Sequence, residues 1–184
     1  MPFCPVTPWS ARAFNSLWFS KGTRRACGIT DLSSYFHRLD AVQGWNRALG
    51  PRGFVQYQFA VPDGEERVMT EVLQAVHSER CAPFLGTLKR FGPSAGGHLS
   101  FPLPGWSLAI DMPAANTRLA PLLRRMDAQV AAAGGRVYLA KDGCLDDETF
   151  SAMYGRLPQW QETRARLDPA GVFRSDLGRR LGLC

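Results

Sequence analysis

The sequence predicts an α+β fold, a ferredoxin-like βαββαβ unit with an antiparallel sheet and both helices on one face of it. One observation is the strict alternation of apolar and polar residues over 54–61, which indicates a half-buried strand. Another is the recurrence of apolar residues at helical spacing in 64–80 and 118–133. The third is the order of the segments along the chain, in which each helical segment lies between two strand-like runs. Those runs cover residues 54–61, 84–90, 105–112 and 136–140.

Each predicted helix has one apolar stripe that can cover a sheet. In the first helix the stripe consists of Val68, Val72, Leu73 and Val76. In the second it consists of Leu119, Leu122, Leu123, Met126 and Val130. Pro121 is compatible with the second helix because it lies in or next to the first turn, where a backbone N–H has no helical partner. Gly134 and Gly135 end that helix before the last strand.

A helical segment is predicted after the sheet. Asp146 or Asp147 suits the N-cap of a helix. Apolar residues follow it at helical spacing, namely Phe150, Met153, Tyr154 and Leu157. Pro158 suits the first turn of a further helix that runs to Leu167, and Asp168, Pro169 and Gly171 end it.

Composition narrows the class of protein. The chain has 184 residues, and its longest apolar runs are far shorter than the roughly 18 residues that span a bilayer. Pro2, Pro5 and Pro8 interrupt the region where a signal peptide needs an apolar helix, so we expect a cytoplasmic protein or one peripheral at a membrane. The formal net charge of +6 favours anionic partners. Five widely spaced cysteines without a C-x-x-C pair predict free thiols and no metal site.

The period of two along each strand assigns side chains to the two faces of the sheet. Val55, Tyr57, Phe59, Val61, Phe84, Leu88, Leu108, Ile110, Val137 and Leu139 are predicted to face the helices. Gln56, Gln58, Thr87, Lys89, Ser107, Ala109, Asp111, Tyr138 and Ala140 are predicted to face the open side, with Lys141 at the strand end. Amides, hydroxyls and lysines suit a polyhydroxylated or phosphorylated ligand. A half-exposed antiparallel sheet with no ligand shows the same alternation, so both interpretations stand at this point.

Several functional classes lack their motifs. There is no Gly-rich dinucleotide loop, no P-loop and no serine or cysteine in a nucleophile elbow. The histidines, His37, His77 and His98, are dispersed. The open-face positions lack the stacking aromatic residues of an RNA-binding sheet, so we expect no nucleic-acid partner.

Several stretches resemble, in the same order, the C-terminal half of the decaprenylphosphoryl-β-D-ribose oxidases. They are 45-WNRALGPRGFVQYQFAVP-62, 88-LKRFGP-93, 99-LSFPLPGWSLAIDMP-113, 134-GGRVYLAKD-142 and 168-DPAGVFRSDLGRRL-181. The resemblance extends more loosely over 9–40 through 14-FNSLWF-19. These enzymes are vanillyl-alcohol-oxidase-type flavoenzymes, a superfamily that includes the sugar-lactone and alditol oxidases. The resemblance implies a connecting segment at 1–50, a substrate (cap) domain at 51–141 and a helical C-terminal segment at 142–184, with the FAD-binding N-terminal domain absent.

The implied activity is an FAD-dependent oxidation of the 2'-hydroxyl of a polyprenyl-phosphate-linked ribose to a ketone. The resemblance further implies that a separate NAD(P)-dependent reductase completes the epimerisation and that the product is an arabinose precursor for cell-wall arabinan. Matched position by position, Gln56, Gln58 and Lys89 correspond to substrate-pocket residues, and Ser107 and Ala109 to a pocket strand. Tyr138 and Lys141 correspond to residues at the flavin and the reacting sugar, and Lys141 is the first choice for the cation beside the flavin.

Two departures from the family pattern affect this interpretation. Ser107 and Ala109 stand where mycobacterial members have an Asn and a Cys, so a pocket thiol is missing. The His-Trp-Gly-Lys run of the sugar-lactone oxidases reads Tyr138-Leu139-Ala140-Lys141 here, which argues against a lactone substrate. The alternatives are a sugar-lactone or alditol-type oxidase, and a non-catalytic module that binds an anionic ligand.

Overall fold

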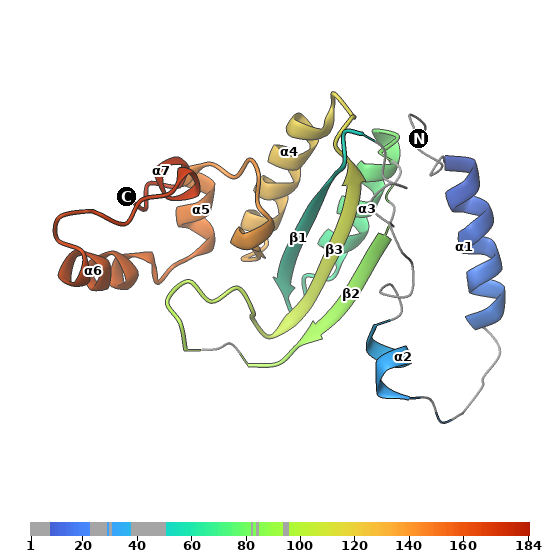
Figure 1. Cartoon of the computed structure of the whole chain (residues 1–184), viewed down its shortest axis with the longest axis horizontal. Coiled ribbons are helices and arrows are strands. Elements are labelled where there is room, and N and C mark those ends of the chain that lie inside the picture. Colours follow the sequence, from blue (N-terminus) through green and yellow to red (C-terminus); the bar gives the residue numbers. More distant parts are fainter. Residues whose placement is uncertain are drawn as a thin grey trace.

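The computed structural model describes residues 8–22, 29, 31–37, 51–81, 83, 85–93 and 96–184. Its centre is a four-stranded antiparallel sheet with the order β2-β3-β1-β4 (Figure 1). The strands are β1 (Phe54–Pro62), β2 (Leu85–Phe91), β3 (Gly105–Pro113) and β4 (Arg136–Val137). Helix α3 (Arg67–Ser78) follows β1, and helix α4 (Leu119–Ala132) follows β3. The predicted α+β class and βαββαβ order are confirmed.

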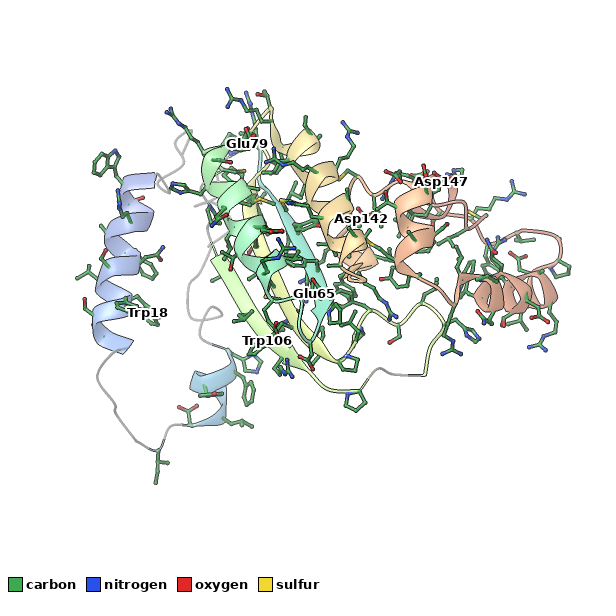
Figure 2. The ribbon with its side chains drawn as sticks, turned by 180° about the vertical axis from the view of Figure 1, so that it is seen from behind. Trp18, Glu65, Glu79, Trp106, Asp142 and Asp147 are labelled. Carbon is green, nitrogen blue, oxygen red and sulfur yellow. The ribbon has the colours of Figure 1, made fainter. Side chains whose placement is uncertain are left out.

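The main core lies between the sheet and these two helices. Figures 1 and 2, which view the molecule from opposite sides, show α3 and α4 on the same face of the sheet. On β1, Tyr57, Phe59 and Val61 are buried on this side, as the alternation predicts. Their buried partners on the helices are Val68, Met69, Val72, Val76, Leu119, Leu122, Leu123, Met126 and Val130. Each such side chain contributes roughly 1.5–3 kcal/mol when it is fully removed from water.

The fourth strand is shorter than predicted. It ends at Val137, and after Tyr138 a 3-10 helix, η2 (Leu139–Lys141), takes the place of the last expected strand residues. At the end of the strand, the Tyr154 hydroxyl donates to the Val137 carbonyl over 2.8 Å. The Val137 N–H also points at the sulfur of Met153, 3.4 Å away. Side chains of the C-terminal segment therefore satisfy the outer edge of β4 at Val137.

The prediction for Leu88 is correct in direction and wrong in burial. Leu88 pairs with Leu108 and so points toward the helix side, yet 58% of it is exposed. β2 lies at the edge of the sheet, where the helices do not cover it. Phe84, predicted to point the same way, lies outside the described residues.

Three C-terminal helices extend the same core. They are α5 (Asp147–Met153), α6 (Leu157–Leu167) and α7 (Asp176–Arg180). Asp146 is the N-cap of α5 and accepts the Thr149 N–H over 2.7 Å. Buried residues of this segment join the core beneath the sheet, namely Leu145, Phe150, Met153, Tyr154, Leu157 and Leu181.

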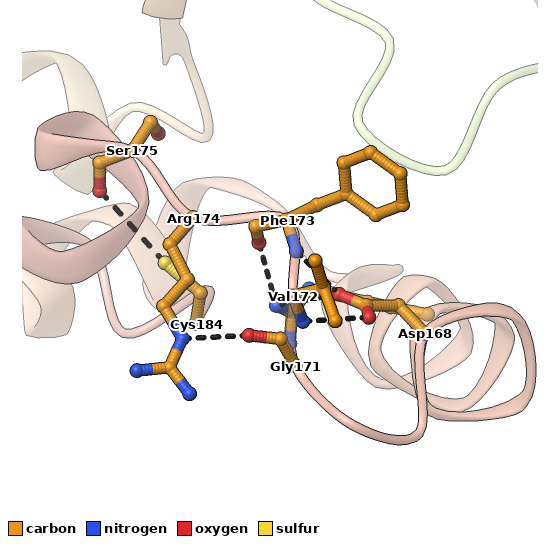
Figure 3. A network of polar contacts seen from close by, with 8 residues as sticks. Asp168, Gly171, Val172, Phe173, Arg174, Ser175 and Cys184 are labelled. Carbon is orange, nitrogen blue, oxygen red and sulfur yellow. Dashed lines mark hydrogen bonds and ion pairs between the residues drawn. The ribbon is translucent and has the colours of Figure 1, made fainter.

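The turn after α6 is organised by one carboxylate (Figure 3). Asp168 accepts the N–H groups of Val172 and Phe173 over 2.8 and 3.0 Å. These hydrogen bonds hold the pKa of Asp168 below its ordinary value, because they favour the ionised form. Arg174 then closes the turn by donating to the Gly171 carbonyl over 2.6 Å. The turn directs the chain back toward α7.

The region before the sheet is described only in part. Helices α1 (Pro8–Gly22) and α2 (Leu32–Phe36) lie apart from the sheet on the side of β2 (Figure 1). Their large apolar side chains are exposed, including Trp9 and Trp18 on α1. Much of the predicted connecting segment, 1–50, lies outside the described residues. Within the described part of the chain, no helix has the length and apolar character needed to span a membrane.

A buried carboxyl group joins α4 to the sheet. The Tyr57 hydroxyl donates a hydrogen bond of 2.9 Å to Asp127, and both side chains are buried. The Cys144 thiol lies 3.8 Å from the other carboxyl oxygen. Burial raises the pKa of Asp127 from 3.8 to about 6, although the Tyr57 hydrogen bond opposes the shift. Asp127 is therefore protonated in weakly acidic solution.

Asp127→Asn will remove a pH dependence of stability. In the unfolded chain the carboxyl group loses its proton near the ordinary pKa, whereas the folded chain keeps it until about pH 6. The free energy of unfolding therefore falls by up to about 3 kcal/mol as pH rises from about 4 to about 6. The variant keeps an acceptor for Tyr57 but has no proton to lose. Urea unfolding of both proteins will show the variant gaining relative stability as pH rises, and a constant difference contradicts the assignment.

Candidate functional site

The sheet face opposite α3 and α4 gathers the predicted polar residues. Residues directly opposite in an antiparallel pair project to the same face. The register pairs Gln56 with Asp111 and Gln58 with Ala109 between β1 and β3. It pairs Lys89 with Ser107 between β2 and β3. We call this surface the polar face, and its residues are Gln56, Gln58, Thr87, Lys89, Ser107, Ala109, Asp111 and Tyr138.

The two glutamines are fixed by hydrogen bonds across the β1–β3 pair. The Gln58 side-chain amide donates to the Ser107 hydroxyl over 3.1 Å, and both residues are buried. The Gln56 amide donates to the Asp111 carboxylate over 2.5 Å in a half-buried setting. These hydrogen bonds fix the orientation of each side-chain amide group. The side-chain carbonyl oxygen of each glutamine remains as an acceptor for a further hydrogen bond.

Tyr138 and Lys141 reach the polar face from the end of β4. The Tyr138 N–H donates to the Gln58 carbonyl over 2.8 Å, which continues the strand pairing by one residue. In η2 the chain then turns, and the Lys141 ammonium lies 5.9 Å from the centre of the Tyr138 ring. This is a cation–π distance. The residue that follows, Asp142, forms a 2.9 Å ion pair with Arg180 of α7, so the C-terminal segment holds η2 in place (Figure 2 labels Asp142).

The charges on this face are coupled. Burial lowers the pKa of Lys141, the nearby Lys89 lowers it further, and Asp111 raises it. Burial likewise raises the pKa of Asp111, against the hydrogen bond from Gln56 and the charge of Lys141. Among the described residues, neither lysine forms an ion pair with a carboxylate. The face therefore presents ammonium groups whose charge is not neutralised by direct contact.

Asp111→Asn will lower the pKa of Lys141 further, because the variant loses the negative charge that favours the ammonium form. The change is measured by NMR titration of the lysine side chain. Asp176→Asn is the control, since Asp176 is exposed on α7 and pairs with Arg179 there. A Lys141 pKa that stays unchanged or rises in Asp111→Asn contradicts the coupling.

Part of the polar face is covered by the connection between β2 and β3. Phe101 and Leu103 of this connection are buried against Ala60. The Phe101 ring lies 4.7 Å from the Tyr138 ring and 5.7 Å from the Phe91 ring. The expectation of an open, solvated face is therefore wrong for Gln58, Ser107 and Ala109, all of which are buried. Gln56, Tyr138 and Lys141 stay partly accessible.

The structure thus brings the predicted site residues together. Gln56, Gln58, Lys89, Ser107, Ala109 and Tyr138 share one face, and Lys141 lies over Tyr138. Asp111 and Phe101 were not among the predicted site residues. The alternation places Asp111 on this face, but its bond to Gln56 depends on strand register. Within the described chain, no group of three His, Cys, Asp or Glu side chains is arranged to hold a metal ion.

Comparisons with known proteins show which proteins this chain resembles. Over 167 residues the chain is 39% identical to a decaprenylphosphoryl-β-D-ribose oxidase of Mycolicibacterium smegmatis. This chain is related to that ribose oxidase. The alignment covers 91% of this chain and 36% of the ribose oxidase. The chain therefore spans about a third of the length of that relative.

Two further matches bear on the family. Residues 109–181 match the D-arabinono-1,4-lactone oxidase family, and this range runs from the second half of β3 through α4 and β4 to the C-terminal helices. The chain is also 44% identical over 160 residues to an uncharacterized protein in the mprA 5' region of Streptomyces coelicolor. That alignment covers 87% of this chain and 43% of the relative. The ribose oxidase and the lactone oxidase family both place this chain among relatives of oxidoreductases.

Proposed function

We propose that this chain forms the substrate-binding part of an FAD-dependent oxidoreductase that acts on a CH–OH group. The substrate in this proposal is a polyprenyl-phosphate-linked ribose, whose 2'-hydroxyl is oxidised to a ketone. The observation that carries the proposal is the convergence of Gln56, Gln58, Tyr138 and Lys141 on one sheet face. The 39% identity to the ribose oxidase supports oxidation of a ribose as the reaction.

The residues on the polar face fit one end of a flavin. Lys141 is a half-buried cation without an ion-pair partner among the described residues, and it lies over an aromatic ring. FAD, when bound, accepts a hydride and gains negative charge on its ring system. Tyr138 and Lys141 would hold that ring system, and the fixed ammonium of Lys141 would stabilise the added charge.

The remaining polar residues are suited to holding a sugar. Gln58 is locked by Ser107, so its carbonyl oxygen has a fixed direction for accepting a hydroxyl proton. Gln56 is oriented in the same way by Asp111. Lys89 adds positive charge on the exposed strand β2, where it would meet the substrate phosphate. Ala109 lies between Gln58 and Thr87 in the sheet and has the smallest side chain of the three.

The proposal includes partners. The FAD-binding half of the protein would supply most contacts to the cofactor, and a separate NAD(P)-dependent reductase would act on the ketone to complete the epimerisation to the arabinose form. The product would serve arabinan formation in the cell wall. A lipid-linked substrate fits a protein that works at the membrane surface, as a peripheral protein.

A second candidate is a sugar-lactone oxidase. The match of residues 109–181 to the D-arabinono-1,4-lactone oxidase family favours it. The segment 138–141 argues against it, because only the lysine of the His-Trp-Gly-Lys run of the sugar-lactone oxidases is present there. The two candidates share the flavin chemistry and differ in the substrate, so one assay can distinguish them.

The test is a chimera in which this chain replaces the matching region of the Mycolicibacterium smegmatis ribose oxidase. We expect the purified chimera to show flavin absorption and to oxidise a polyprenyl-phosphoryl ribose but not arabinono-1,4-lactone. Oxidation of the lactone alone supports the second candidate. A chimera that holds FAD and oxidises neither compound contradicts both and favours a binding module.

A further inference from the structure

A small cleft outside the predicted site residues lies beside β4. Its walls come from the β2–β3 connection, from β4 and from the junction of α5 and α6. Figure 1 shows this connection extending from the sheet toward the C-terminal helices. The cleft has a volume of about 100 Å³, and its lining includes His98, Ser100, Arg136, Tyr154 and Arg156. No carboxylate lines it.

Two arginines bring positive charge to the cleft. Arg136 donates to the Ser100 carbonyl over 2.7 Å, and its guanidinium carbon lies 5.6 Å from the centre of the Tyr154 ring. Arg156 donates to the Gly96 carbonyl over 3.1 Å. Within the part of the chain that the structure describes, neither arginine forms an ion pair. Each guanidinium group has five N–H donors, so most of them remain available.

Two residues that line the cleft each have a buried nitrogen atom without a hydrogen-bond partner. They are the Nε atom of Arg136 and the Nδ1 atom of His98. Leaving such a group unpaired costs about 1–3 kcal/mol, and more when the group is charged. An acceptor bound beside Arg136 would satisfy its Nε–H group. The unpaired Nε–H group of Arg136, together with the remaining N–H donors of both guanidinium groups, therefore favours an anionic ligand.

The volume limits the size of this ligand. Sites for whole small molecules usually measure about 300–1,000 Å³. A cleft of about 100 Å³ can accept one compact group and not a sugar ring or a nucleotide. Arginine pairs with phosphate oxygens through parallel N–H bonds, and the Tyr154 ring keeps the Arg136 guanidinium plane in place.

We propose that Arg136, Arg156 and His98 form a binding site for a phosphate group. The site takes either free inorganic phosphate or the phosphate of a lipid. Arg136 of β4 and Arg156 at the start of α6 already donate hydrogen bonds to the backbone of the β2–β3 connection. A bound phosphate would therefore link this connection more firmly to β4 and α6. This inference goes beyond the proposed oxidase and does not rest on it.

The first experiment is calorimetric titration of the 184-residue chain with inorganic phosphate, at an ionic strength held constant with sodium chloride. We expect saturable binding that Arg156→Gln weakens at least about tenfold. Arg166→Gln is the matched control, because Arg166 is exposed on α6 outside the cleft. Arg156 is exposed as well, so its substitution leaves the core intact, whereas Arg136→Gln also removes the bond to Ser100.

The second experiment distinguishes the two sources of phosphate. Phosphatidylcholine vesicles with and without a polyprenyl phosphate are tested for binding to the same proteins. Binding to the phosphate-containing vesicles that depends on Arg156 supports a lipid source, and binding of free phosphate alone supports the free ion. Absence of both, or equal weakening by Arg156→Gln and Arg166→Gln, overturns the site. Neither measurement involves flavin or substrate oxidation, so a negative result for the phosphate site does not contradict the proposed oxidase function.

Discussion

Lys141→Ala, introduced into the flavin-containing chimera, will lower kcat for ribosyl-lipid oxidation by about 100- to 1,000-fold. The substitution removes the half-buried ammonium group over Tyr138 that would stabilise negative charge on the cofactor. Because this interaction strengthens as the charge develops, the loss will fall on kcat more than on KM. Steady-state kinetics with the ribosyl lipid measure both.

Lys21→Ala is the control for this experiment. Lys21 is exposed in the last turn of α1, so its loss removes the same charge away from the polar face. Its kcat should match that of the parent chimera. A fall in kcat of less than about threefold in Lys141→Ala, with FAD still bound, would remove Lys141 from the proposed mechanism.

Gly105→Ala will destabilise the fold by about 3 kcal/mol or more. Gly105 begins β3 with φ +153°, a conformation that residues with a side chain rarely adopt. A Cβ atom there would overlap the Val61 carbonyl oxygen and would lie 2.9 Å from the Cα of Pro62. Both contacts belong to β1, the central strand, so the backbone of the sheet would have to move.

Gly86→Ala is the matched control for Gly105→Ala. Gly86 lies on β2, and no heavy atom lies within 4 Å of a Cβ built on it. Its substitution should leave the free energy of unfolding within about 0.5–1 kcal/mol of the parent. Urea denaturation of the parent and of the two alanine variants measures their free energies of unfolding. Equal stability of the two variants would show that a side chain is tolerated at the start of β3.

The alternation in the sequence was sufficient to predict the two faces of the sheet. On β1, Tyr57, Phe59 and Val61 lie on the side covered by α3 and α4, so their burial follows from their parity, whereas Val55 near the start of the strand is only partly buried. The shared face of Gln56, Gln58, Lys89 and Ser107 follows from the same parity. The roles of these residues in binding or catalysis stay predictions.

Other features depend on contacts between distant parts of the chain, which a local pattern does not contain. The outer edge of β4 at Val137 is satisfied by the hydroxyl of Tyr154, which lies 17 residues further along the chain. Leu88 has the pattern of a buried residue, but its exposure depends on where α3 and α4 end over the sheet. The burial of Gln58 and Ser107 accompanies a Gly- and Pro-rich connection whose Phe101 packs onto Tyr138. Strand register alone decides that Gln56 meets Asp111.

The way in which β4 is completed affects how shorter versions of this protein can be designed. Its outer edge is satisfied by Tyr154 and Met153 from α5, and Leu181 near the C-terminus belongs to the main core. A truncation after residue 141 would expose both the strand edge and the apolar floor beneath it. Expression trials and limited proteolysis should therefore treat residues 51–181 as one cooperative unit.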